Sequence, residues 1–220
     1  MPKLWKNDDA LFALARKELF TAVVGDVMDK LGLRRQFLPP RIQPLDRAMA
    51  TIGRAMTVLE ADCFEDSGFG LMFEALDNLE KNEVYVCAGA SPTYALWGEL
   101  MSVRAMQCGA VGAILDGYSR DTRGILKLRF PCFSYGSYAQ DQGPRGKVIG
   151  YRVPIEMDGV RILPGDIVFG DLDGVCVVPR ESEEAVFRAA IEKARGEKTV
   201  RKSLERGMTA RDAFNKYGIL

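Results

Sequence analysis

An arginine and an aspartate stand side by side just beyond a short apolar segment. The stretch AILDGYSRDTRG covers residues 113–124 and places Arg120 directly before Asp121. Arginine offers a planar fork that binds a carboxylate or an enolate oxygen, and aspartate is a hard oxygen ligand that suits Mg²⁺. Such a pair is more commonly a surface ion pair with other residues. The pair alone therefore leaves both interpretations open.

The sequence contains no histidine. This excludes a Ser-His-Asp triad, a Cys-His dyad and a His-ligated zinc or iron centre. Carboxylates, Arg, Lys, Tyr, backbone amides or a hard metal ion remain, and carboxylate and water ligands favour Mg²⁺ or Mn²⁺. The cysteines are odd in number, widely spaced and mostly set in apolar runs, so we expect buried reduced thiols rather than disulfides or a zinc site. They are Cys63, Cys87, Cys108, Cys132 and Cys176.

A second feature is the loop in CAGASPTYALWGELMS. A strand is expected to end near Ala88, and Gly98 introduces a helix. The free amides of Glu99, Leu100 and Met101 at that helix start would suit a carboxylate or a phosphate. Every helix has such an end, so an ordinary helix start is the competing interpretation.

The two features are expected to meet. A helix over 98–108 followed by a strand over 111–116 forms a short helix-turn-strand unit. The end of that strand should return to the edge where the helix begins, so Arg120 and Asp121 are expected to face the Gly98 loop. The glycines of CGAVGA lie between a helix and a strand, which is the wrong order for a phosphate-binding loop.

Other charged residues favour structural roles. Arg123, Lys127 and Arg129 are typical of a solvated face, and the aspartates of PGDIVFGDLDG are turn formers first. Thirty basic and thirty acidic residues cancel, so no overall charge favours nucleic acid or a membrane surface. With no long apolar run and no secretory signal, we expect a cytoplasmic protein.

The pattern of elements predicts an α/β fold in one domain, residues 1–220. Helices are expected within 1–19, over 21–32 with Thr21 as N-cap, and over 70–80, and strands over 53–61 and 83–89. This alternation favours parallel strand pairs. The turns MDG, PGD and DLDG predict antiparallel hairpins in the second half. Helices follow over 181–220, with Thr209 as the N-cap of the last.

Taken in order, four segments resemble the RraA-like family. They are TAVVGDVMDKLG, GRAMTVLEA, ALWGELMSVRAMQCGAVGAILDGYSRD and VRILPGDIVFGDLDGVCVVPR. The family includes divalent-metal-dependent 4-hydroxy-4-methyl-2-oxoglutarate aldolases and regulators of ribonuclease activity. The resemblance covers most of residues 20–200. It implies a layered α-β-β-α sandwich with a mixed sheet and a C-terminal helical tail, assembled as a homotrimer or a homohexamer.

The resemblance also implies roles for the residues above. Amides of Gly98, Glu99, Leu100 and Met101 would hold the carboxylate of a pyruvate-type substrate, and Arg120 would contact its oxygens. Asp121 would ligate Mg²⁺ or Mn²⁺ through a water-rich shell. Glu99 could hold one of those waters.

A neighbouring subunit would add a glutamate from its C-terminal helix. Glu197 is the candidate for that residue, with Glu192 as the alternative.

Two positions depart from the aldolase pattern. Gly124 stands where an acidic residue is usual, and KNEVYV stands where PGDVLV is typical. The expected function is a metal-dependent lyase that releases pyruvate from a 4-hydroxy-2-oxo acid and also decarboxylates oxaloacetate. The alternatives are a non-enzymatic regulator that binds a ribonuclease and an enzyme of a sugar-acid pathway with the same enolate chemistry.

Overall fold

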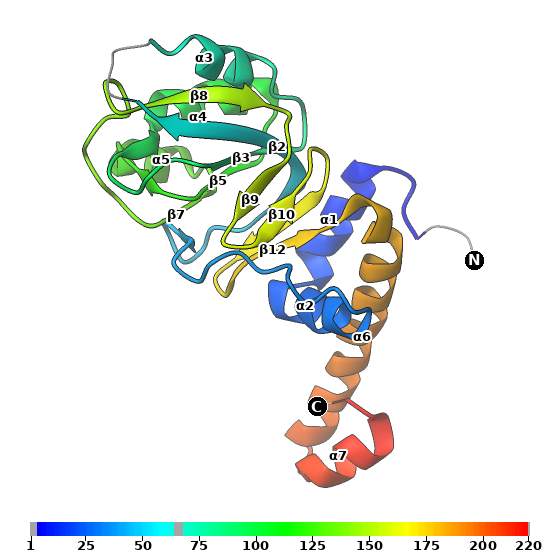
Figure 1. The fold of residues 1–220 in the computed structure, drawn as a ribbon. Helices are drawn as coiled ribbons and strands as arrows, with labels where there is room; N and C mark the ends of the chain where they lie inside the picture. The colour runs from blue at the N-terminus through cyan, green and yellow to red at the C-terminus, as the bar shows by residue number, and fades with distance from the viewer. Residues whose placement is uncertain (1–3, 64–67, 220) are drawn as a thin grey trace.

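The structure is a computed structural model that describes residues 4–63 and 68–219. Apart from a short 3-10 turn at Arg180–Ser182, its helical segments are α-helices (Figure 1). They are α1 (Asp8–Glu18), α2 (Thr21–Lys30), α3 (Gly70–Asp77), α4 (Glu99–Cys108), α5 (Thr122–Leu128), α6 (Glu183–Glu205) and α7 (Ala210–Tyr217).

Most strands belong to one eight-stranded mixed sheet, with the order β1-β7-β5-β3-β2-β11-β12 and with β8 pairing with β2. Its strands are β1 (Gln43–Pro44), β2 (Thr51–Asp62), β3 (Glu83–Ala88), β5 (Gly112–Leu115), β7 (Cys132–Ser134), β8 (Gly146–Tyr151), β11 (Ile167–Asp171) and β12 (Gly174–Val178). Two small pairs lie outside it: β9 (Ile155–Met157) with β10 (Val160–Ile162), and β4 (Ala95–Trp97) with β6 (Tyr118–Ser119).

Side chains alternate between the two faces of this sheet. In β3, Val84 and Val86 belong to one buried cluster, whereas Tyr85 and Cys87 belong to another. The first cluster also includes residues of β7, β11, β12 and the β9–β10 hairpin, so the curved sheet and the hairpin enclose it. A strand buried on both faces reads as a continuous apolar run, as EVYVCA does.

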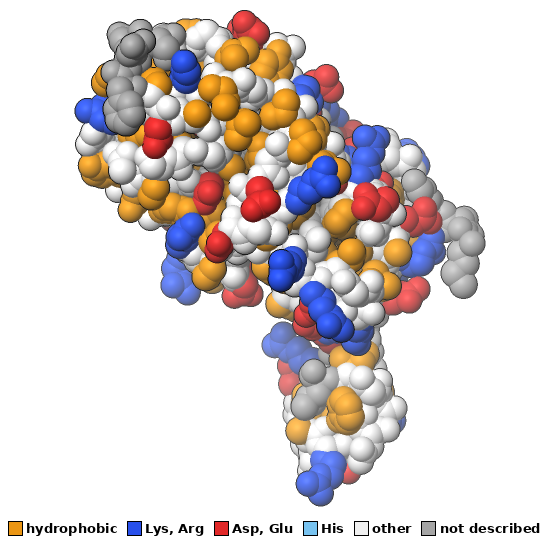
Figure 2. All heavy atoms as spheres, viewed as in Figure 1, with side chains coloured by type: hydrophobic (Ala, Val, Ile, Leu, Met, Phe, Trp, Pro, Cys, Tyr) orange, Lys and Arg blue, Asp and Glu red, His pale blue; other side chains and the backbone are white. Residues whose placement is uncertain are grey.

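Helices cover the outer face in two groups. Helices α1, α2 and α6 pack against β2, β11 and β12 in one cluster, and α3, α4 and α5 pack against β2, β3 and β5 in the other. The second half of α6 extends away from the sheet. Helix α7 folds back against α6 at the lower end of the view (Figure 1). In the space-filling view this C-terminal part stands apart as a narrow projection (Figure 2).

The fold confirms the expected α/β class with a mixed sheet and C-terminal helices. The β2–β3 and β3–β5 pairs are parallel, and the β9–β10 and β11–β12 pairs are antiparallel hairpins, as expected. Asn7 and Thr209 cap α1 and α7 with their side chains.

Two expectations about helices were wrong or incomplete. The N-cap of α2 is Phe20, and Thr21 is the first helical residue. The amide and the hydroxyl of Thr21 both donate to the carboxylate of Asp171, at 2.7 Å each. The helix start is therefore capped by an aspartate that is distant in sequence, and not by the Thr21 side chain. The basic run that contains Arg123, Lys127 and Arg129 is exposed as expected, but most of it forms helix α5, which the sequence did not predict.

Cys87, Cys132 and Cys176 are buried, as expected, whereas Cys63 and Cys108 are only partly buried. Within residues 4–63 and 68–219, no helix combines the length and the apolar character needed to cross a membrane.

Candidate active site

Two short parallel strands bring the glycine loop and the Arg-Asp pair together. Strand β4 leads into Gly98 and α4, and strand β6 leads into Arg120 and Asp121. The two strands pair with Trp97 opposite Ser119, and the Arg120 amide donates to the Trp97 carbonyl at 2.8 Å. The helix-turn-strand unit was expected to bring these residues to one edge, and the structure brings them together there.

The closeness of Asp121 favours glycine at position 98. A Cβ atom added at Gly98 would lie 2.7 Å from Oδ2 of Asp121, which is closer than a real Cβ atom approaches an oxygen. The backbone at Gly98 is extended, with φ −147°, so available space rather than conformational freedom selects glycine here. The aspartate therefore lies directly against the start of α4.

The start of α4 has no cap from a side chain. Within the described chain, the amides of Glu99, Leu100 and Met101 donate to no hydrogen-bond acceptor. Free amides and the helix dipole together favour a negatively charged group at this point. The free amides expected at this helix start are thus present, and their role in binding a carboxylate stays a prediction.

Buried side chains hold the turn at Gly98 in place. The Trp97 indole donates to the Ser102 hydroxyl at 2.7 Å, and that hydroxyl donates to the Gly98 carbonyl at 3.0 Å. The Trp97 ring is stacked on Phe130, with centroids 5.9 Å apart and an angle of 12° between the planes. The backbone that would contact a ligand therefore rests on a packed, hydrogen-bonded support.

Arg120 is shared between two carboxylates. Its Nη1 lies 3.1 Å from Oδ1 of Asp141, and its Nε lies 3.8 Å from Oδ2 of Asp121. Asp121 adopts the left-handed conformation, with φ 55°, and is the N-cap residue of α5. Aspartate tolerates this region better than most residues. About half of the Asp121 side chain is exposed, so its carboxylate can accept a ligand.

Glu99 occupies the space beside Gly124. A Cβ atom at position 124 would overlap the carboxyl group of Glu99. The aldolase pattern that the sequence resembles has an acidic side chain at position 124. In the structure the carboxylate of Glu99 lies over that position instead. The absence of a side chain at Gly124 and the placement of Glu99 are thus two parts of one arrangement.

A cavity of about 260 Å³ opens beside Gly98, Arg120 and Asp121. Its lining also includes an apolar contribution from α3 and residues of the loop that precedes β8. The lining residues are Phe69, Met72, Phe73, Ala95, Leu96, Trp97, Gly98, Leu100, Met101, Arg120, Asp121, Asp141 and Gln142. Drug-sized ligands occupy roughly 300–1,000 Å³, so this cavity suits a small substrate.

Comparison with known proteins identifies the family. A model of the RraA-like family, described as Aldolase/RraA, matches residues 21–177. The chain belongs to the RraA-like family. The match spans α2, the central sheet and the whole candidate site, but ends before α6 and α7.

Relatives in this family carry different names. A Halalkalibacterium halodurans protein named "Putative 4-hydroxy-4-methyl-2-oxoglutarate aldolase" is 32% identical over 173 residues, which are 79% of each protein. Protein DlpA of Legionella pneumophila is 27% identical over 199 residues. The aligned region is 90% of this chain but only 32% of the Legionella protein.

Solved structures share the fold. A crystal structure described as that of novel cellulases from microbes of the gut ecosystem superposes with a TM-score of 0.84, at 33% identity and with 90% of both chains covered. RraAS2 of Streptomyces coelicolor, described as an unusual member of the RNase ES inhibitor RraA protein family, gives a TM-score of 0.79 at 24% identity. It covers 90% of this chain and 98% of RraAS2, and at this identity it supports the fold alone.

The RraA-like resemblance also pointed to α6. Glu197 lies on that helix and accepts a hydrogen bond from Lys193, whose Nζ also lies 2.9 Å from Asp26. Neither Glu197 nor Glu192 lines the cavity in its own chain. Any contribution of either residue to a site would therefore come from a second copy of the chain.

Sequence reasoning missed Asp141 and Gln142. Both lie in a loop without periodicity, which a single bridge between Ala95 and Asp141 brings to β4. The one signal available was the turn-rich run DQGPRG, which marks a loop but not its position.

Strand β2 carries a buried carboxyl group. Glu60 lies where the pairing of β2 with β8 shifts register, and only 2% of it is exposed. Burial raises the pKa of Glu60 to about 8, against the opposing effect of the nearby Tyr94 hydroxyl and Cys87 thiol. Glu60 is thus largely protonated at neutral pH, although it does not line the cavity.

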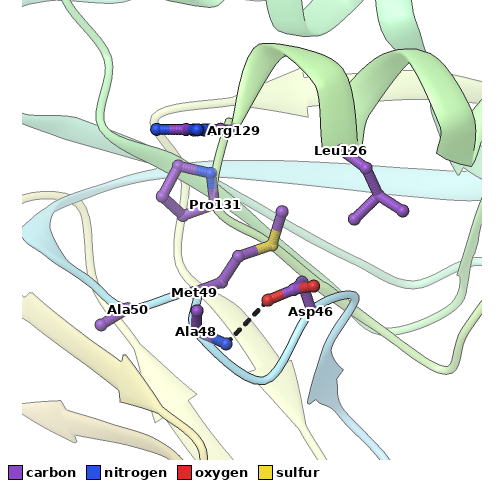
Figure 3. A pocket seen from close by; sticks show the side chains of 7 residues that line it. All are labelled: Asp46, Ala48, Met49, Ala50, Leu126, Arg129 and Pro131. Carbon is purple, nitrogen blue, oxygen red and sulfur yellow. Dashed lines mark hydrogen bonds between the residues drawn. The ribbon is translucent and has the colours of Figure 1, made fainter.

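A second cavity, of about 360 Å³, lies between the loop before β2 and the end of α5 (Figure 3). Its walls include Met49, Leu126 and Pro131, and its charged groups are Asp46 and Arg129. The Asp46 carboxylate accepts a hydrogen bond from the Ala48 amide at 2.8 Å, which closes the local turn. Although larger, this cavity contains none of the unpaired amides, so the smaller one is the better candidate.

Proposed function

We propose that this protein is a divalent-metal-dependent lyase that cleaves the C3–C4 bond of a 4-hydroxy-2-oxo acid and releases pyruvate. The observation that carries the proposal is the open start of α4, with three unpaired amides, directly against Asp121 and beside Arg120. Membership of a family that includes proteins named as aldolases supports the same reaction class.

The chain's own groups suit both ends of a pyruvate unit. The C1 carboxylate binds the amides of residues 98–101, where the helix dipole adds attraction. The Arg120 guanidinium lies close enough to contact the C2 oxygen and balances the charge that develops there when C3–C4 breaks. Positive charge aimed at a developing oxyanion is commonly the largest contribution to such catalysis.

The carboxylates fit a hydrated Mg²⁺ or Mn²⁺. Asp121 is half exposed and lies against the α4 start, and Glu99 reaches the space over Gly124. Among the described residues no three Asp, Glu or Cys side chains form a closed ligand cage. Mg²⁺ commonly keeps several waters and takes only one or two protein carboxylates, so this donor set suits it. When bound, the metal would act as a Lewis acid toward the 2-oxo acid.

The bond changes balance without a further reactant. The C4 hydroxyl loses its proton to a base, the C4–O bond becomes a carbonyl, and the electrons of C3–C4 form the enolate of pyruvate. A proton then adds at C3. The chain has no histidine, and we propose a water held by the metal or by the site's carboxylates as the base. Oxaloacetate decarboxylation yields the same enolate with loss of CO₂, so one site performs both reactions.

We further propose that the active form is a homotrimer or a homohexamer. In it, Glu197 from α6 of a neighbouring subunit completes the site. Activity would then depend on assembly, and dilution to a monomer would remove it.

The test is a panel of 2-oxo acids, including oxaloacetate, with Mg²⁺ or Mn²⁺ and detection of pyruvate. We expect release that EDTA stops and that Asp121→Ala abolishes. Asp158→Ala is the matched control, because Asp158 is another exposed aspartate in the left-handed conformation, with φ 50°, at the β9–β10 turn. Unchanged activity in Asp121→Ala would overturn the proposal. A stable complex with a ribonuclease and no release of pyruvate would favour a regulator instead.

A further inference from the structure

Part of the cavity lining is apolar. Phe69, Met72 and Phe73 of the α3 region meet Leu100 and Met101 of α4, and we call these five residues the distal wall. The rings of Phe69 and Phe73 pack at 5.8 Å between centroids, and 54% of Phe73 is exposed. A substrate group placed here would therefore cover apolar surface that otherwise faces water.

The described lining of the cavity has more acidic than basic side chains. Arg120 is the one cation among the described lining residues, whereas Asp121 and Asp141 are both acids. Arg120 already pairs with both acids, and nearby Arg145 donates through Nη1 to the Asp141 carbonyl at 3.1 Å. Once Arg120 binds the pyruvate end of a substrate, no cation of the described lining is left for a second carboxylate.

One neutral hydrogen-bond donor of the lining has no partner. Gln142 lines the cavity, only 4% of it is exposed, and its Nε2 has no hydrogen-bond partner within the described chain. A buried amide N–H₂ normally finds an acceptor, and because Gln142 belongs to the cavity lining, a turn of its side chain would offer this unpaired N–H₂ to an oxygen of a bound molecule.

We propose that the substrate is a 4-hydroxy-2-oxo acid whose C4 substituent is uncharged and apolar, so that the second product is an apolar aldehyde or ketone. The distal wall covers that substituent, and Gln142 donates to the C4 oxygen, which becomes the carbonyl during cleavage. This inference rests on the proposed function and specifies its substrate class.

The physical basis is the cost of moving a charge out of water. A carboxylate against the distal wall would lose hydration, would find no free cation in the described lining of its own chain and would share the cavity with two acids of the same sign. An alkyl group in the same place gains free energy in proportion to the apolar area that it covers. The site therefore discriminates by rejecting charge as well as by contacting the apolar group.

The test compares two substrates that differ at one group. In 4-hydroxy-2-oxohexanoate the C4 substituent is ethyl, and in 4-hydroxy-2-oxohexanedioate it is carboxymethyl. We expect kcat/KM to favour the hexanoate by at least tenfold in the wild-type protein. Preference for the hexanedioate would overturn the inference while leaving the lyase function in place. Release of pyruvate from none of the substrates, oxaloacetate included, would overturn both.

Variants test whether the distal wall sets the preference. Phe73→Arg supplies a cation at that wall, so we expect the ratio of the two kcat/KM values to move at least tenfold toward the hexanedioate. Phe214→Arg is the matched control, because Phe214 of α7 is 57% exposed and does not line this cavity. An unchanged ratio in Phe73→Arg would contradict the assignment of the wall.

Gln142→Met tests the donor. This change removes an amide N–H₂ that has no hydrogen-bond partner among the described residues, so the midpoint of thermal unfolding should hold. We expect kcat/KM to fall about tenfold for both substrates, which is the effect of losing one hydrogen bond to the substrate. Unchanged kcat/KM in a folded Gln142→Met protein would exclude Gln142 from the site.

Discussion

The starts of helices α2 and α4 offer a direct comparison. Both helices have ten residues, and neither N-cap residue offers a capping side chain. At α2, the carboxylate of Asp171 accepts from both the amide and the hydroxyl of Thr21, at 2.7 Å each. At α4, the amides of residues 99–101 have no acceptor in the described chain, although Asp121 lies beside Gly98.

The difference lies in how each aspartate is used. Asp171 comes from the end of β11, 150 residues away from Thr21, and its carboxylate lies at the α2 start, where it accepts from the first helical residue. Asp121 lies at the side of the α4 start, half exposed and only 3.8 Å from Arg120. A carboxylate of the fold therefore occupies the α2 start, whereas we propose that an external anion occupies the α4 start.

The largest expected effect separates activity from stability at the α4 start. Arg120→Ala removes the one cation of the described cavity lining, so we expect kcat/KM for pyruvate release to fall about a hundredfold to a thousandfold. Urea unfolding should be nearly unchanged, because the side chain is partly exposed. Arg104→Ala is the control, since Arg104 of α4 forms a surface ion pair with Asp77 at 2.7 Å. Equal losses in both variants would contradict the special role of Arg120.

The converse effect is expected at the α2 start. Asp171→Ala removes a charged acceptor from two donors of Thr21, and we expect the free energy of unfolding to fall by about 2 kcal/mol. The KM for a 2-oxo acid should not change. Asp173→Ala, in the same exposed turn, serves as the control in urea titrations. A large change in KM for Asp171→Ala would remove the distinction between the two helix starts.

A smaller effect is expected where Glu99 meets Gly124. Gly124→Ala would displace the Glu99 carboxyl group, and alanine suits a helix better than glycine does, so the fold should hold. We expect the Mg²⁺ concentration for half-maximal activity to rise about tenfold. Glu99→Gln should give a similar rise.

The double variant shows whether the two changes act on one interaction. Gly124→Ala with Glu99→Gln should be no worse than either change alone, because both remove the same carboxylate. Gly150→Ala is the control, since a Cβ atom there makes ordinary contacts of 3.5 Å and more. Additive effects would contradict a shared origin.

The smallest effect concerns Glu60, a carboxyl group that is buried rather than exposed. Burial raises its pKa from 4.5 to about 8, so the folded state binds a proton that the unfolded state releases above pH 4.5. Stability contributed by protonated Glu60 is therefore complete below pH 4.5 and is lost as the pH rises toward 8. We expect a loss of about 1 kcal/mol between pH 7 and pH 8.

Glu60→Gln should remove that slope, because glutamine does not titrate. Urea titrations at pH 6, 7 and 8 measure it in both proteins. The same slope in both would mean that another group titrates.

The sequence predicted the local parts of the site. Gly98, Arg120 and Asp121 could be brought together because a helix and the strand after it return the chain to one edge. The free amides of α4 followed from helix geometry alone. Most helices and strands followed from their periodicity, since the apolar positions of β3 and α1 carry a clear pattern.

The remaining parts depend on contacts between distant segments. The capping of Thr21 by Asp171 leaves no trace in either local pattern. Gln142 reaches the cavity through a loop that only tertiary pairing positions. The contact of Glu99 with Gly124 depends on helix α5. The sequence did not predict this helix, because its N-cap is an aspartate in the left-handed conformation and its basic residues are typical of a solvated loop.

The central claim is that an anionic ligand completes the α4 start. Oxalate resembles the enolate of pyruvate but cannot be cleaved, so it can be added with Mg²⁺ while amide resonances are recorded by NMR. We predict saturable shifts for Leu100 and Met101, none for Thr21, and loss of the shifts in Arg120→Ala. Unshifted Leu100 and Met101 amides in the wild-type protein at saturating oxalate would contradict the account.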